Sequence, residues 1–222
     1  MRKLWIPILL LLLVPTVTAH VPVPTVHARP MDTYVTAVAS TKAWGVAWDS
    51  SNDRIWAFGP WNLNMTVVNA ATHTVVNTFN TGTTTQWQQD QLAYDPLSHT
   101  MYLDNQGGGT VVPINTATYA VGTGISTGIS HPMGIVYDPY YRYIYAVDGS
   151  GGKIGVINAT TNTSLGYVSG TANQAICYDP HTKEVYALDD AGDVTPINNT
   201  TAGSVWSVGS FYFEARNPAG AA

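Results

Sequence analysis

Charged residues are scarce in this chain: Asp, Glu, Lys and Arg make up only 10% of its 222 residues. The nine basic residues form no long run, and 14 acidic residues outnumber them. Because a surface of net negative charge repels a polyanion, this composition argues against binding of nucleic acid.

Cysteine is nearly absent, and the single Cys177 cannot form an internal disulfide. It lies in the apolar run "QAICYDP", which predicts a buried and unreactive thiol.

Long apolar runs are missing after the first 20 residues. Arg2 and Lys3 precede an apolar run of 11 residues, Leu4–Val14, and small residues follow it. This order is typical of a secretory signal peptide. A membrane-spanning helix needs about 20 apolar residues, so the run is too short for a good anchor, although an uncleaved N-terminal anchor is the alternative. We predict a signal peptide over residues 1–19, a Pro-rich linker over 20–30, and a secreted or extracellular-surface chain without a membrane span after cleavage.

The chain is built from an internal repeat. An Asp that follows an aromatic residue occurs four times, at intervals of 46, 43 and 41 residues. A second aromatic residue stands seven positions after each Asp, an Asn comes later in each copy, and a Gly closes it. The Asp residues are Asp49, Asp95, Asp138 and Asp179; the aromatic residues are Trp56, Tyr102, Tyr145 and Tyr186; the Asn residues are Asn69, Asn115, Asn158 and Asn198.

Each copy holds four short segments of β-branched, aromatic or alternating residues, separated by turn-forming residues. In the third copy these segments are 133–137, 143–147, 153–158 and 164–168. A period of about 40–45 residues with four strands is the signature of a β-propeller blade. No segment after the signal peptide has a helical period. The sequence therefore predicts an all-β chain that forms a small or partial β-propeller of about four four-stranded blades.

The expected propeller spans residues 31–215, and residues 216–222 form a tail. Four blades are the lowest number that closes into a ring. Residues 31–40 and 210–215 have the pattern of additional strands, and 31–40 could close the ring by joining the last sheet. An open propeller would expose the faces of its terminal blades, which favours self-association, most simply as a symmetric dimer of two part-propellers. The expected blades are about 40–82, 83–128, 129–170 and 171–209.

The repeat resembles the YVTN-type β-propeller repeat, whose name marks the end of its second strand. The corresponding tetrads are "WAFG" (56–59), "YLDN" (102–105), "YAVD" (145–148) and "YALD" (186–189). The Tyr-Asp-Pro turns and the "SHPMGIVYDP" segment that opens the third copy are also similar to that family. The resemblance implies an exported propeller, often part of a cell-surface or surface-layer protein, but it implies no single chemistry. The chain departs from the family in showing four copies, where the family has seven.

The repeated landmarks are predicted to be architectural. Asp and Asn at these positions cap turns by accepting hydrogen bonds from the backbone that follows them. The repeated aromatic residues are expected to pack between neighbouring blades. None of these positions is therefore interpreted as a catalytic carboxylate or a metal ligand.

Residues that differ between the copies are the better site candidates. In a propeller, the loops before the first strand and after the second strand converge at one mouth of the central channel, and they carry Asp90, His131, Asn173, Asp104, Asn105, Asp148 and Asp189. Carboxylate and amide oxygens there could hold Ca²⁺ or another hard cation, with Asp104, Asp148 and Asp189 as the candidate ligands. Asp148 and Asp189 also occupy the fourth tetrad position, so a role in turns is the alternative. His131 is the one candidate general base, and no nucleophile elbow, phosphate loop or zinc spacing occurs.

Two functions fit these features. The favoured one is a non-catalytic binding or assembly scaffold, secreted or at the cell surface, with a protein or glycan partner. The alternative is an extracellular, metal-assisted lactonase-like or lyase-like enzyme with its site at the channel mouth. Five Asn-x-Ser/Thr sequons are candidate glycosylation sites in an exported chain: Asn64, Asn158, Asn162, Asn198 and Asn199.

Overall fold

The structure, a computed structural model, describes residues 43–84, 90–170, 174–189, 191–201, 204–207 and 211–212. These residues belong to one compact unit, 37–222. The expected signal peptide, linker, C-terminal tail and candidate closing segment 31–40 lie outside the described residues. Within the described part, no helix is long and apolar enough to cross a membrane.

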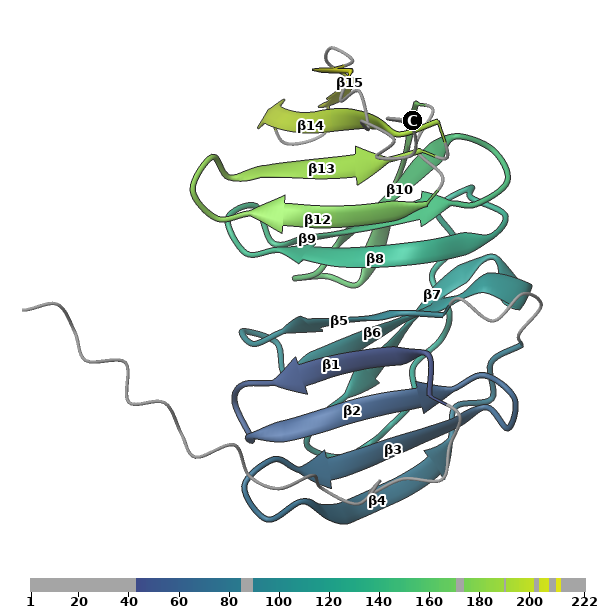
Figure 1. The fold of residues 1–222 in the computed structure, drawn as a ribbon, viewed down its shortest axis with the longest axis vertical. Coiled ribbons are helices and arrows are strands. Elements are labelled where there is room, and N and C mark those ends of the chain that lie inside the picture. The colour runs from purple at the N-terminus through teal and green to yellow at the C-terminus, as the bar shows by residue number, and fades with distance from the viewer. Residues whose placement is uncertain are drawn as a thin grey trace, which may run out of the picture. The chain divides into compact units, whose positions relative to one another are not determined.

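The described strands form four antiparallel sheets, one for each copy of the repeat, and consecutive strands pair within each sheet (Figure 1). The first sheet contains β1 (Gly45–Asp49), β2 (Arg54–Gly59), β3 (Asn64–Asn69) and β4 (Thr74–Asn80). The second contains β5 (Leu92–Asp95), β6 (Thr100–Asn105) and β7 (Thr110–Asn115). The third contains β8 (Pro132–Asp138), β9 (Tyr143–Asp148), β10 (Lys153–Asn158) and β11 (Thr163–Ser169). The fourth contains β12 (Ala175–Asp179), β13 (Glu184–Leu188), β14 (Asp193–Thr201), β15 (Ser204–Ser207) and β16 (Phe211–Tyr212).

This arrangement confirms the predicted fold class, with differences in two sheets. The second sheet has three strands, and in place of a fourth strand the chain makes two isolated bridges, Val111 to Ile125 and Ile114 to Val121. Pro113 on β7 explains the interruption, because proline has no N–H to donate to the ladder. In the fourth sheet, β16 pairs with β14 as a further strand, within the predicted segment 210–215.

The repeated Asp residues cap the turns between the first and second strands, as predicted. The Oδ1 atom of each accepts a backbone N–H from two residues later: Ser51 to Asp49 at 3.0 Å, Leu97 to Asp95 at 2.9 Å, Tyr140 to Asp138 at 2.8 Å and His181 to Asp179 at 2.8 Å. Asn69, Asn115 and Asn158 cap the later turns in the same way. The side chain of Asn198 lies outside the described residues.

Replacing Asp138 by Ala is expected to lower the free energy of unfolding by about 1 kcal/mol, the usual size of a lost capping interaction. Asp138 is 1% exposed and accepts N–H donors from Tyr140 and Tyr141, which the variant leaves without an acceptor. Thermal unfolding measures the change. An unchanged unfolding midpoint together with loss of ligand binding would show that Asp138 belongs to a site.

Three apolar cores join neighbouring sheets in chain order: first to second, second to third and third to fourth. The repeated aromatic residue of each sheet packs toward the next sheet, so Trp56 and Tyr102 are fully buried and Tyr145 is 1% exposed. This confirms the predicted packing for three of the four positions. Tyr186 is only half-buried, because no described sheet follows the fourth one.

The prediction for Cys177 is wrong. Its thiol belongs to an exposed residue, not to the core. Cys177 lies on β12 beside Tyr186 of β13, on the face of the fourth sheet that points away from the third. An apolar strand predicts burial only where a neighbouring sheet covers it, and here the described residues supply none.

Candidate functional site

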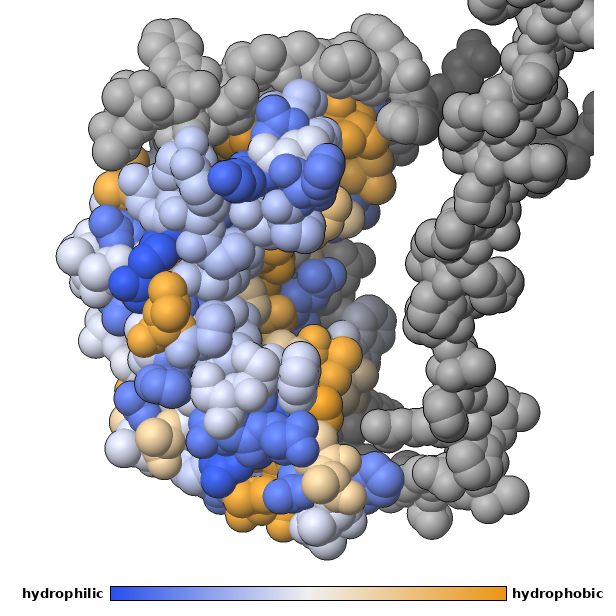
Figure 2. Space-filling view, turned by 90° about the vertical axis from the view of Figure 1, so that its left-hand side faces the viewer, coloured by the Kyte–Doolittle hydropathy of each residue, from blue (hydrophilic) through white to orange (hydrophobic). Residues whose placement is uncertain are grey.

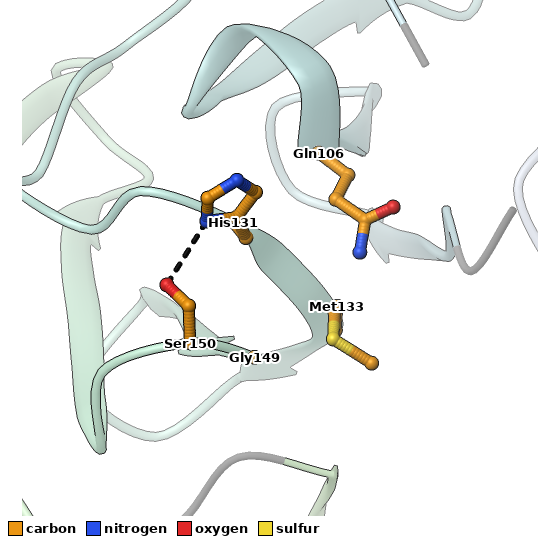
Figure 3. Close-up of a pocket in the computed structure, with 5 residues that line it drawn as sticks. All are labelled: Gln106, His131, Met133, Gly149 and Ser150. Atoms are coloured by element: carbon orange, nitrogen blue, oxygen red, sulfur yellow. Dashed lines mark hydrogen bonds between the residues drawn. The ribbon is translucent and has the colours of Figure 1, made fainter. Parts of the chain in front are cut away.

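Loops of the second and third copies line a pocket. A cavity of about 420 Å³ is lined by Gln106, His131, Met133, Gly149 and Ser150. Gln106 begins the 3₁₀ turn η1 (Gln106–Gly108) after β6, His131 precedes β8, and Ser150 follows β9. Figure 3 shows these side chains around the cavity, with His131 and Ser150 on one side and Gln106 and Met133 on the other. Of the predicted site residues, only His131 lines this pocket.

A hydrogen-bond chain fixes the ring of His131. The Ser150 hydroxyl donates to Asp148 Oδ1 at 3.0 Å, and His131 Nδ1 lies 2.9 Å from Ser150 Oγ (Figure 3). Because the only hydroxyl hydrogen of Ser150 goes to Asp148, Nδ1–H of His131 donates to Ser150. In the neutral ring this leaves Nε2 as a hydrogen-bond acceptor at the pocket.

Asp148 organises the loops around that ring. Its carboxylate accepts backbone N–H donors from Ser130 at 3.2 Å, His131 at 3.0 Å and Ser150 at 3.2 Å. Burial alone would raise the pKa of Asp148, but these donors hold the pKa below its ordinary value. The Asp148 carboxylate is therefore used in hydrogen bonds to the adjacent loops. This agrees with a role in turns, the alternative to a metal ligand.

Two buried carboxyl groups occur in the second copy: Asp90 precedes β5, and Asp104 lies on β6. Asp90 Oδ1 accepts the backbone N–H of Gln106 at 3.1 Å, and Asp104 Oδ1 accepts the N–H of Gln91. Asp90 is 1% exposed and Asp104 is fully buried, and the second oxygen of each has no hydrogen-bond partner among the described residues. Burial raises the pKa of Asp90 to about 6 despite the Gln106 N–H. Burial and the charge of Asp90 together raise the pKa of Asp104 well above its ordinary value.

Asp104 stands at a position that is apolar in the other copies. The equivalent residues are Phe58, Val147 and Leu188, and the first two are fully buried. A carboxyl group at this core position is costly when ionised. The sequence signal was therefore present, as an acidic residue at a position that is apolar in the other copies, but the proximity to Asp90 depends on the fold.

The remaining predicted residues lie apart and are occupied locally. Asn105 Oδ1 accepts the N–H of Thr84 at 2.9 Å, and its Nδ2 donates to Thr110 at 3.1 Å. Asp189 Oδ1 accepts the N–H groups of Ala191 at 3.0 Å and Asp193 at 2.8 Å. Asn173 lies outside the described residues. Within the described ranges, no three His, Cys, Asp or Glu side chains gather in a way that could hold a metal ion.

Sequence reasoning missed a second cavity, of about 560 Å³, at the opposite ends of the innermost strands β1, β5, β8 and β12. Its lining includes the aromatic residue before each repeated Asp: Trp48, Tyr94, Tyr137 and Tyr178. Pro96, Pro139 and Pro180, which follow three of these Asp residues, also line it. Figure 2 views the side of the molecule that carries these turns, where hydrophobic patches lie among hydrophilic residues. The signal was the recurrent aromatic-Asp-Pro sequence itself, interpreted only as a turn.

No protein-family model and no functionally curated protein matches the chain. Solved structures do match. Hydrazine synthase of Kuenenia stuttgartiensis aligns with a TM-score of 0.63 and 17% identity, over 82% of this chain and 52% of that one. The WD40 repeats of RRP9 align with a TM-score of 0.63 and 7% identity, over 78% and 53%. A putative 6-phosphogluconolactonase of Bacteroides uniformis aligns with a TM-score of 0.62 and 15% identity, over 79% and 58%.

These similarities concern the fold, because the identities are low. The neighbours include WD40 repeats and a lactonase-like protein, so the four sheets described above are β-propeller blades. The chain spans only a little more than half the length of the solved chains that it matches.

Proposed function

We propose that this chain is an exported, non-catalytic propeller module that binds a protein or a glycan at the cell surface. The proposal depends mainly on the hydrogen bonds of two predicted acidic residues, Asp148 beside the pocket and Asp189 in the fourth copy. Both accept backbone N–H donors from their own turns, so they serve as structural groups. The pocket walls then offer one imidazole, one amide, one hydroxyl and one thioether. Such a lining suits recognition of a neutral polar or amphipathic group.

Export rests on the N-terminal signal pattern and on the resemblance to the YVTN-type repeat. Three of the predicted sequons have described side chains. Asn64 begins β3 and is half-buried, while Asn158 and Asn162 flank the turn between β10 and β11, and Asn162 is exposed. Both side-chain Oδ1 atoms accept hydrogen bonds, from Thr160 and from the Tyr102 hydroxyl respectively. Glycosylation would modify the amide nitrogen of these residues, whereas the hydrogen bonds above involve the amide oxygen. Whether the sequons are glycosylated depends on the host that exports the chain.

One observation favours the alternative, an enzyme. The chain from Asp148 through Ser150 fixes the tautomer of His131 and leaves Nε2 at the cavity as a base (Figure 3). A hydrolase of lactones would need this base to activate a water. A metal-assisted version is not supported, because the candidate ligands Asp104, Asp148 and Asp189 are each held in separate local hydrogen bonds.

A paired assay separates the two functions. The chain is screened on a glycan array and against glucono-δ-lactone and 6-phosphogluconolactone, beside the His131→Gln and Met133→Arg variants. We expect lactone hydrolysis at the background rate, and binding of an array ligand that falls by roughly tenfold in Met133→Arg, because the arginine fills the pocket. Leu97→Arg, at a residue 64% exposed and outside the pocket lining, is the control. Hydrolysis above background that His131→Gln abolishes would replace the binding proposal with the enzymatic one.

A further inference from the structure

The three interfaces between sheets are built from equivalent positions of the repeat. The residues one and three positions before the repeated Asp contact the preceding sheet: Leu92 and Tyr94 pack in the first core, Ile135 and Tyr137 in the second, and Ile176 and Tyr178 in the third. The residue two positions before the Asp belongs to the core with the following sheet: Ala47, Ala93 and Val136. Each sheet thus has two different faces: a predecessor face, which packs on the sheet before it in the chain, and a successor face, which packs on the sheet after it.

The first sheet has a predecessor face that no described sheet covers. Val46 and Trp48 stand at the positions of Leu92 and Tyr94, and they are 66% and 58% exposed. The equivalent Leu92 and Ile135 are 8% and 6% exposed. Ile176, Tyr94, Tyr137 and Tyr178, at the remaining equivalent positions, are half-buried. Val46 and Trp48 are thus large apolar side chains at positions that are buried or half-buried in the later sheets.

The fourth sheet has a successor face that no described sheet covers. Tyr186 is half-buried, although the equivalent residues of the other three sheets are at most 1% exposed. Beside it, Cys177 is exposed at the position of Ala47, Ala93 and Val136. A hollow of about 240 Å³ lies on this sheet, lined mainly by apolar residues that include Cys177, Tyr186 and Leu188.

We propose that a second copy of this chain covers both faces. The fourth sheet of each copy packs on the first sheet of the other, with Val46 and Trp48 of one copy entering the hollow beside Cys177 and Tyr186 of the other. At all three interfaces inside the chain, the successor face of one sheet packs on the predecessor face of the next. The exposed face of the fourth sheet is a successor face and that of the first sheet is a predecessor face, so the two can pack in the same way. A second copy therefore fits these faces, because it presents the equivalent repeat positions. An unrelated apolar partner would not present them.

Two copies form both interfaces at once under a single two-fold axis. Four sheets from each copy make eight, which lies within the 4–8 blades of closed propellers. The length agrees, since one chain spans 52–58% of the solved propeller-like chains that it matches. Closure removes both exposed faces, so neither copy is left with a surface for further growth into a filament.

Cysteine cross-linking tests the interface directly, because the chain contains a single cysteine. In Trp48→Cys the new thiol is expected to form a disulfide with Cys177 of the second copy under mild oxidation. The reason is the equivalent pair inside the chain. Ala47 stands at the position of Cys177 and Tyr94 at that of Trp48, and these two residues pack in the same core between the first and second sheets. We expect most of the oxidised variant to migrate as a dimer without reductant. Leu97→Cys is the matched control, because Leu97 is similarly exposed, 64% against 58% for Trp48, and belongs to neither face; it should form at most a minor dimer.

A second variant guards against misfolding of the first. Val46→Glu alters a residue that is 66% exposed in one copy, so a single chain should fold with its circular dichroism spectrum unchanged. We expect sedimentation of the unmodified chain at about 50 µM to give a dimer, a concentration at which even a micromolar interface is mostly formed. Val46→Glu should sediment as a folded monomer. A monomeric unmodified chain, or equal cross-linking of Trp48→Cys and Leu97→Cys, would overturn the proposal.

Discussion

At pH 7.5 the Asp104→Asn variant is expected to unfold at a higher urea concentration than the unmodified chain. Asp104 is fully buried, has one oxygen without a partner in the described part of the chain, and lies near the charge of Asp90. An amide at this position retains an acceptor for the N–H of Gln91 and removes the buried charge. The expected gain in the free energy of unfolding is about 2 kcal/mol, within the range of the penalty for a buried polar group that is left without a partner.

The same pair sets a pH dependence with a defined sign. A carboxyl group whose pKa is raised by folding binds more protons in the folded state, so its contribution to stability is present below the unfolded pKa of 3.8 and is lost as the pH rises through the folded pKa, about 6 for Asp90. The unmodified chain should therefore lose stability between about pH 4 and 7, and Asp104→Asn should lose less. Urea titrations at pH 4.5, 6.0 and 7.5 measure both slopes.

Asp95 provides a control of opposite sign. Burial alone would raise its pKa, but hydrogen bonds from Ser98 and Leu97 and the charge of Arg142 hold the pKa below its ordinary value. Its ionised form is therefore stabilising at neutral pH, and Asp95→Asn should lower the free energy of unfolding at pH 7.5. A loss of stability in Asp104→Asn at that pH would contradict the assignment of an uncompensated buried carboxylate.

Replacing Tyr145 by Ala is expected to lower the free energy of unfolding by about 4 kcal/mol, as large-to-small changes of buried aromatic residues do. Tyr145 is 1% exposed in the core between the third and fourth sheets. Tyr186→Ala removes the same side chain from the same position of the next copy, where it is half-buried. Its cost in a monomeric chain should be about 1 kcal/mol, because less apolar surface is lost.

Urea unfolding at a protein concentration low enough to keep the chain monomeric measures both variants. A dimer of the kind proposed above would raise the cost of Tyr186→Ala at higher concentration and leave that of Tyr145→Ala nearly unchanged. Equal costs for the two variants at every concentration would show that the exposed face of the fourth sheet is covered within the single chain.

The sequence by itself determined the turns, their repetition and most of the strands, because these depend on local chemistry. Asp138 caps the turn that follows it within three residues, and the alternation in β9 specifies which side chains share a face. The repeat also assigns His131 to the loop before a first strand, and in the structure this residue lines the pocket.

Only the tertiary structure decided which repeat positions are covered and which polar groups meet. Cys177 and Val136 occupy equivalent positions in similar apolar strands, yet Cys177 is exposed because the described chain places no sheet after the fourth one. Asp90 and Asp104 are 14 positions apart in the sequence and influence each other only because the chain folds back through β5 and β6. Burial and the pKa of a carboxyl group arise from neighbours across the fold, and a local pattern carries no information about those neighbours.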